Sequence, residues 1–223
     1  MKTHNSQLYI AQTLLLFMLL LAATPIIADT IAFTPTGGSA SAGWTARLEL
    51  GARFSVSSPL AVTGLGYYDF GSDGFLNPHA VTLWDDVGNM IASATVSSLS
   101  QVEGDTFAGG AFRFAPIVVT LETGIYRLSG RLESYDFIDP VLFDNSSPGD
   151  APLTASGITY LGRVVGPDWS GAEAFPSVII DNNATNWFGP NLLVTPVPEP
   201  SLLLLALLGV STALCFRQRR AKA

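Results

Sequence analysis

Residues 47–68 read RLELGARFSVSSPLAVTGLGYY, and the pattern in this stretch points to β-structure. Hydrophobic and polar side chains alternate from Arg47 to Val56, which is the period of a strand with one buried face. Pro59 breaks the pattern, and a second strand-like run extends from Leu60 to Tyr68. We therefore expect two consecutive β-strands here.

Segments of the same kind follow along the chain. They are short, rich in Val, Ile, Thr and aromatic residues, and spaced by roughly 8–12 residues. No long window between residues 29 and 195 keeps the helical period of hydrophobic side chains. The sequence predicts an all-β domain, an antiparallel β-sandwich of jelly-roll type. The further expected strands are residues 80–84, 89–96, 111–114, 117–121, 125–132, 158–163, 177–180 and 187–194.

Turn-forming residues separate these segments. Asp85–Asn89, Gly104-Asp105 and 122–124 are expected turns, and residues 133–157 are expected to form a loop. Residues 32–43 are small, polar and turn-prone. The expected core consists of Leu48, Leu50, Phe54, Val62, Leu65, Val81, Leu83, Ile91, Phe112, Phe114, Val119, Leu121, Tyr126 and Leu128.

Charge is distributed unevenly over the 223 residues, whose net charge is −7. Between residues 29 and 195 there are 17 acidic side chains and six arginines, which gives this part −11. Such a domain repels phosphate backbones, so we expect no nucleic-acid partner. Cys215 is the only cysteine, which excludes an internal disulfide, a cysteine metal cluster and a thiol nucleophile from residues 29–195.

The N-terminal 28 residues have the three parts of a secretory signal peptide. Lys2 precedes an apolar run over residues 8–23, Pro25 follows, and Ala28 is the expected cleavage position. An uncleaved membrane anchor is the alternative. Cleavage would leave residues 29–195 as one exported domain, a length sufficient for a single hydrophobic core.

The C-terminal segment, residues 196–223, has three parts in a fixed order. The sequence Val197-Pro198-Glu199-Pro200 comes first, and an apolar run over residues 202–216 follows it. As a helix this run would be about 22 Å long, slightly shorter than the hydrocarbon core of a bilayer. The basic stub at 217–223 should remain cytoplasmic and stop translocation. Its basic residues are Arg217, Arg219, Arg220 and Lys222.

The ordered combination of Pro198-Glu199-Pro200, an apolar span and an arginine cluster resembles the PEP-CTERM protein-sorting tail. The resemblance implies a Gram-negative host and an exosortase, a membrane protease-transpeptidase that recognises residues 197–200 and cleaves at or near them. It also implies transient anchoring in the inner membrane, followed by transfer to the cell surface or the exopolysaccharide matrix. A generic tail anchor is the alternative.

A second resemblance concerns residues 44–194. The runs 65–84, 88–96 and 121–126, together with Phe188-Gly189-Pro190-Asn191, are similar to an uncharacterised β-sandwich domain common in PEP-CTERM proteins. This resemblance implies a fold and an association with the sorting tail, and no activity.

Candidate site residues are few. Asp69 and Asp73 lie in a glycine-rich loop and are candidate calcium ligands, but the loop does not match the calcium-loop pattern, and turn formation is the simpler explanation. His79 is the only histidine after residue 28, and no nucleophile motif lies near it. Asp85-Asp86 most simply closes a hairpin. Aromatic residues that form either the core or a sugar-stacking platform are Trp44, Trp84, Trp169, Trp187, Tyr67, Tyr68 and Tyr160.

The sequence therefore predicts a non-enzymatic, exported surface or matrix protein without catalytic residues or a resident cofactor. Its expected partners are an exosortase-like protease and exopolysaccharide. A carbohydrate- or calcium-binding module on the same scaffold is the alternative function. A hydrolase that uses His79 is a third hypothesis.

Overall fold

The computed structural model of the chain describes residues 28–37, 39–41, 48–107, 109–132, 141–144, 152–167, 174–180 and 186–197. Within these ranges the protein is all-β, its paired strands are antiparallel, and it contains no helix. The all-β part of the predicted fold class is thereby confirmed. No helix in this part of the chain is long and apolar enough to span a membrane. The segments 1–27 and 198–223 lie outside the described residues.

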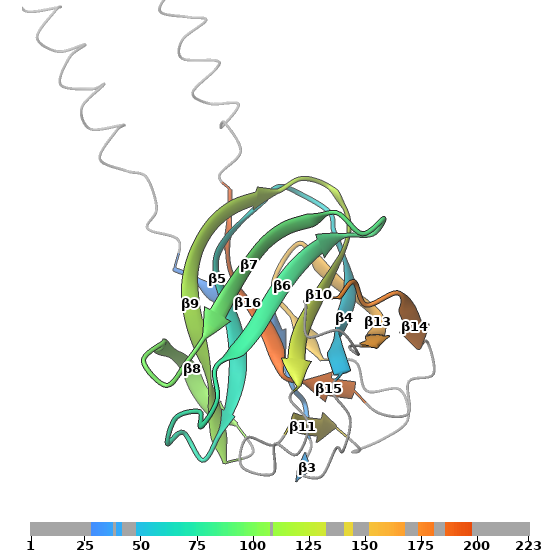
Figure 1. Ribbon diagram of the computed structural model, residues 1–223. Coiled ribbons are helices and arrows are strands. Elements are labelled where there is room, and N and C mark those ends of the chain that lie inside the picture. The colour runs from blue at the N-terminus through green and yellow to red at the C-terminus, as the bar shows by residue number, and fades with distance from the viewer. Residues whose placement is uncertain are drawn as a thin grey trace, which may run out of the picture.

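One sheet has five strands in the order β1-β16-β5-β9-β8. They are β1 (Thr30–Ile31), β16 (Pro190–Pro196), β5 (Leu60–Phe70), β9 (Gly110–Leu121) and β8 (Gln101–Phe107). The first and last strands of the domain therefore pair with each other. Figure 1 shows the blue N-terminal segment beside the red-orange β16.

The other large sheet has six strands in the order β14-β13-β4-β10-β6-β7. They are β14 (Val178–Ile180), β13 (Ile158–Pro167), β4 (Leu48–Val56), β10 (Gly124–Leu132), β6 (His79–Asp85) and β7 (Met90–Val96). Consecutive strands β6 and β7 form a hairpin, while β4, β10 and β13 pair across long stretches of sequence.

Two small sheets complete the described structure. The first joins β15 (Asn186–Phe188), β11 (Val141–Asp144) and β3 (Ser39–Ser41), and it lies at the lower end of the domain in Figure 1. The second pairs β12 (Leu153–Thr154) with β2 (Phe33–Thr34).

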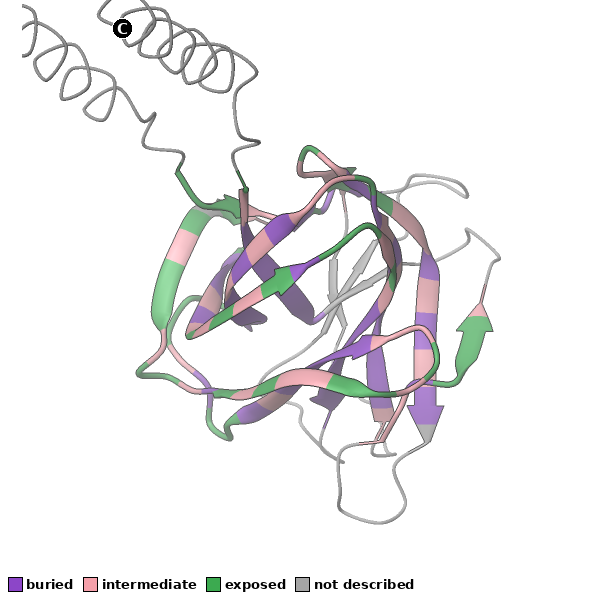
Figure 2. Cartoon of the chain, turned by 90° about the horizontal axis from the view of Figure 1, so that it is seen from above, coloured by how far each residue is buried: buried purple, intermediate pink, exposed green. Residues whose placement is uncertain are grey.

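The hydrophobic core draws its residues from both large sheets. Leu65 and Tyr67 of β5 belong to one buried cluster with Phe54 of β4, Leu83 of β6 and Leu128 of β10. Buried and partly exposed residues alternate along several strands, as the bands in Figure 2 show. The alternation arises because successive side chains of a strand point to opposite faces of its sheet.

Most expected strands exist with bounds close to those predicted. Segments 111–114 and 117–121 are one continuous strand, β9, because Pro116 lies at a register shift between β5 and β9. Proline lacks an amide proton, and at such an irregularity the ladder does not require one. The segment 187–194 contains two strands, β15 and β16, separated at Gly189.

Three expectations about loops were wrong. Gly104-Asp105 lies inside β8 and forms an irregularity of the strand, where Gly104 adopts φ +80° and the pairing with β9 shifts register between Glu103 and Phe107. Residues 133–157 contain β11 and β12, and residues 32–43 contain β2 and β3. These strands are too short to show an alternation of hydrophobic and polar side chains. They form because other parts of the chain pair with them.

Ten of the fourteen expected core residues are buried, and Leu48, Ile91, Val119 and Tyr126 are partly buried. Tyr67 and Tyr68 of β5, for which core and sugar-stacking roles were both open, are among the largest fully buried side chains. Phe33 of β2 and the apolar run Leu192–Val194 of β16 are buried as well and were absent from the expected core.

Candidate functional site

The candidate metal ligand Asp69 forms an ion pair inside the domain. Its carboxylate is fully buried at the end of β5, and Nε of Arg113 on β9 donates to its Oδ2 at 2.6 Å. The Gly74 amide also donates to Asp69, at 3.0 Å to Oδ2. Arg113 further donates to the carbonyl oxygens of Ser98 and Ser100, so it links the loop after β5 to the loop after β7. A buried carboxylate needs such partners.

This geometry gives Asp69 a structural task. The chain turns at 71–74, where Gly71, Ser72 and Gly74 adopt positive φ, and the buried carboxylate of Asp69 holds the turn through Gly74. Within the described part of the chain, no three His, Cys, Asp or Glu side chains lie close enough to hold a metal ion. A cation at Asp69 and Asp73 would have to compete with the Arg113 guanidinium.

His79 lies in the core at the start of β6. Its ring stacks on Tyr67 with a centroid distance of 4.0 Å and an interplanar angle of 2°. Phe75 lies beside this stacked pair, with its ring centroid 4.9 Å from that of His79 and 5.9 Å from that of Tyr67. Nδ1 lies 3.1 Å from the carbonyl oxygen of Arg131. The side chain is 1% exposed, so a substrate would reach it only if this aromatic packing opened.

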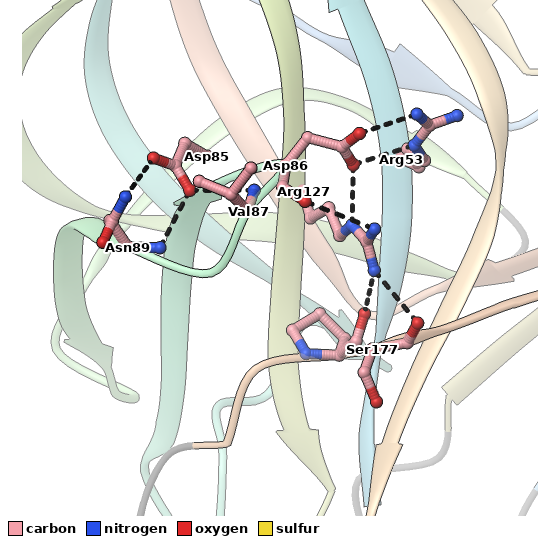
Figure 3. Close-up of polar contacts among 8 residues, drawn as sticks. Arg53, Asp85, Asp86, Val87, Asn89, Arg127 and Ser177 are labelled. Carbon is pink, nitrogen blue, oxygen red and sulfur yellow. Dashed lines mark hydrogen bonds and ion pairs between the residues drawn. The ribbon is translucent and has the colours of Figure 1, made fainter.

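Asp85 and Asp86 serve two different purposes. Asp85 closes the β6–β7 hairpin by accepting hydrogen bonds from the amides of Val87 and Asn89 and from the Asn89 side chain, as expected for a turn residue (Figure 3). These hydrogen bonds, chiefly that of the Asn89 side chain, lower the pKa of Asp85. Gly88, with φ +102°, completes the turn.

Asp86 joins three strands of the six-stranded sheet. Arg53 donates to its carboxylate from Nε at 2.9 Å and from Nη2 at 2.7 Å, and Nε of Arg127 donates at 2.9 Å. Arg127 also donates to the carbonyl oxygens of Pro176 and Ser177, and its guanidinium lies 4.6 Å from the centroid of the Phe175 ring (Figure 3 shows the polar contacts). The two arginines, Arg53 foremost, lower the pKa of Asp86 to about 2.

The aromatic residues that the structure describes do not form a sugar-stacking platform. Tyr67 and Tyr68 are fully buried, and Trp84 is 5% exposed with its indole nitrogen donating to Ser129 Oγ. Burial, with a smaller contribution from Asp69, raises the pKa of the Tyr68 phenol to about 12. Trp44 and Trp169 lie outside the described residues, as does the Trp187 side chain.

The two ends of the domain are joined side by side. Thr30 pairs with Val194, and the Asp29 carboxylate accepts hydrogen bonds from the hydroxyls of Thr195 and Thr63. Val197 donates its amide to the carbonyl oxygen of Pro59 at 3.3 Å. The exposed Ala28 and Val197, the first and last described residues of the domain, therefore lie on the same side of it.

Most of the predicted sorting residues lie outside the described residues. They are Pro198, Glu199, Pro200, Arg217, Arg219, Arg220 and Lys222. Sequence reasoning also missed three polar residues that organise the fold, namely Arg113, Arg127 and Asn191. In the sequence, these three residues are marked only as polar positions within apolar strand segments. This pattern does not identify their hydrogen-bond partners.

These features define an all-β protein of two large antiparallel sheets whose described polar clusters hold loops and chain ends in place. Comparison with known families shows that residues 33–130 are similar to a domain of unknown function, DUF4082. The match runs from the start of β2 to Gly130, near the end of β10, and covers less than half of the chain. No curated protein matches the sequence.

Proposed function

We propose that this chain is an exported, non-enzymatic surface or matrix protein whose C-terminal tail directs its sorting. The domain is a jelly-roll-like β-sandwich preceded by a cleaved signal peptide, residues 1–28. A single membrane helix at 202–216 anchors it until an exosortase-like protease cuts at or near residues 197–200. The product then belongs to the cell surface or the exopolysaccharide matrix of a Gram-negative bacterium.

The observation that carries the proposal is the junction of the two chain ends. Asp29, the first residue after the expected cleavage position, bonds Thr195 of the last strand. With the proposed tail anchored in a membrane, this junction would place one end of the domain at the bilayer and the opposite end away from it. The last strand, β16, ends at Pro196, directly before the sorting motif.

A non-enzymatic role is supported by what the described polar residues do. Asp69, Asp85 and Asp86 are engaged by loop amides and arginines, and His79 is buried against the rings of Tyr67 and Phe75. Catalysis needs an accessible acid or base beside a substrate. These four side chains are instead used to fix the strands and loops.

The test is to express Glu199→Gln, and separately a chain lacking 217–223, in a host that contains the sorting protease. We expect both variants to accumulate as full-length protein in the inner membrane. Glu122→Gln, which replaces an exposed glutamate in the turn before β10, is the matched control and should be processed normally. Normal release of the two tail variants, measured by fractionation and mass spectrometry of the C-terminus, would refute the proposal.

A further inference from the structure

A cleft opens between the N-terminal segment and β8, at the two edges of the five-stranded sheet. Its volume is about 470 Å³, within the roughly 300–1,000 Å³ range of small-ligand sites. Residues 29–35 form one wall and residues 103–107 form the other. Phe112 of β9 and Leu193 of β16, both buried, also line it. We call it the β1–β8 cleft.

The walls of the β1–β8 cleft are held by specific contacts. Gly104 has φ +80°, and a side chain there would collide with Ile31, so this glycine lets β8 approach β1 closely. The Tyr68 hydroxyl donates to the carbonyl oxygen of Phe107 at 2.6 Å and fixes the far end of β8. On the other wall, the side chain of the buried Asn191 bonds both backbone groups of Phe33.

The charge of the cleft is negative on both walls. Asp29 stands on the N-terminal wall and Glu103 on the β8 wall, and no arginine, lysine or histidine is among the residues that line the cleft. The Asp29 carboxylate accepts hydrogen bonds from the hydroxyls of Thr63 and Thr195. The Glu103 carboxylate accepts one from the side-chain amide of Gln101. These partners are neutral, and in the full-length chain the described residues place no cation beside these two carboxylates. Cleavage after Ala28 would add an α-ammonium group to Asp29, so this charge balance applies to the chain that retains residues 1–28.

The cleft suits an organic cation better than a metal ion. Calcium takes about six to eight oxygen ligands, whereas here two carboxylates stand on opposite walls and Ile31, Phe107 and Leu193 supply apolar surface. An extended peptide is also disfavoured. The pairing of β8 with β9 shifts register between Glu103 and Phe107, and a bulged edge offers a poor ladder for an added strand.

We propose that the β1–β8 cleft binds an amino sugar with a free ammonium group. The ammonium lies between Asp29 and Glu103, where charge-assisted hydrogen bonds hold it. The half-buried Phe107 meets the apolar face of the sugar ring, and the threonines on the two walls, Thr34 and Thr106 among them, meet its hydroxyls. This binding goes beyond the sorting proposal and does not depend on the tail being processed.

Calorimetric titration of the full-length protein in nanodiscs of neutral lipid tests the proposal. The probe is the β-1,4-linked disaccharide of glucosamine, and its N,N′-diacetyl form is the matched neutral probe. We expect the amine form to bind at least tenfold more tightly than the acetylated form. Glu103→Gln and Asp29→Asn should each weaken binding about tenfold, while Glu122→Gln leaves it unchanged.

Three outcomes of the disaccharide titrations would overturn the proposal. They are absence of heat with the amino disaccharide, equal affinity for the two forms, and an equal loss of affinity in Glu122→Gln. Tighter binding of trilysine than of the amino disaccharide would assign the cleft to basic peptides and would also overturn it. Thermal melting of each variant separates lost binding from lost folding, because partly exposed Glu103 can be replaced without disturbing the core.

Discussion

Arg113 of β9 and Asp69 of β5 are diagonal neighbours in the paired strands, and their side chains form an ion pair of 2.6 Å near the end of β5. Asp69 has 0% side-chain exposure and Arg113 has 13%, so water screens the pair only weakly. The same guanidinium reaches the carbonyl oxygens of two loops, 71–74 and 97–100. Arg113 thus compensates a buried charge and fixes the loops around it.

Replacing Arg113 with methionine should strongly destabilise the protein, because it leaves the Asp69 carboxylate buried without a counter-charge. The expected loss in the free energy of unfolding is about 3–5 kcal/mol. The double variant Arg113→Met with Asp69→Asn should recover part of that loss, because the buried charge is gone. Urea unfolding monitored by tryptophan fluorescence measures both, and equal stability of the single and double variants would contradict the role of the ion pair.

Calcium should not stabilise the fold through Asp69 and Asp73. A ligand that binds only the folded state raises the free energy of unfolding. Once the ligand concentration exceeds Kd, the increase grows with the logarithm of that concentration. Because Arg113 and Gly74 already occupy the Asp69 carboxylate, we expect no shift in Tm at millimolar calcium. Magnesium at equal ionic strength is the control, and a calcium-specific rise in Tm that Asp73→Asn abolishes would restore the metal site.

The sequence predicted the large sheets well because their strands are long enough to show a period. In β4, residues 48–56 display alternation over nine positions, and the structure buries Leu50, Phe54 and Val56. By contrast, β1 and β2 contain two residues each. Their pairing is decided by partners far along the chain, such as Asn191 for Phe33, and local patterns contain no such information.

The same limit applies to the polar residues. The turn role of Asp85 was predictable because its partners, Val87 and Asn89, lie within four residues. The partners of Asp86 are Arg53 and Arg127, which lie 33 and 41 residues away. Likewise, the β1–β8 cleft joins residues 29–35 to residues 103–107, so no local motif describes it.

Asp86 should make stability depend on pH in the acid range. Its pKa is about 2 in the folded protein against 3.8 for an unperturbed carboxyl, so folding favours the charged form. The contribution is fully present above about pH 5 and is lost as the pH falls toward 2. With allowance for solvent screening of this partly exposed group, its size is roughly 1–2 kcal/mol.

To isolate this effect, the free energy of unfolding is measured by urea denaturation from pH 2 to pH 7 for the wild type and for Asp86→Asn. The variant should be less stable at pH 7. The difference in free energy should shrink below pH 5 and approach zero near pH 2. A difference that stays constant over the whole range would show that the contacts of Asp86 do not depend on its charge.

Replacing Asn191 with leucine should release the N-terminal segment from β16. The buried Asn191 side chain accepts the Phe33 amide at 3.1 Å and donates to the Phe33 carbonyl oxygen at 2.7 Å. Leucine can do neither, so two buried backbone groups lose their partner at a cost of roughly 1–3 kcal/mol each. Hydrogen exchange at the Phe33 amide should accelerate more than exchange at amides in β4 or β10, because the segment opens locally before the domain unfolds.

The control for this change is Asn89→Ala, which removes an exposed hydrogen bond to Asp85 in the β6–β7 hairpin. It should cost at most about 1 kcal/mol and leave exchange at Phe33 unchanged. Because residues 29–35 form one wall of the β1–β8 cleft, Asn191→Leu should also weaken binding of the glucosamine disaccharide. Unchanged protection of the Phe33 amide in Asn191→Leu would show that β1 and β2 are held by other contacts, such as the backbone pairing of Thr30 with Val194.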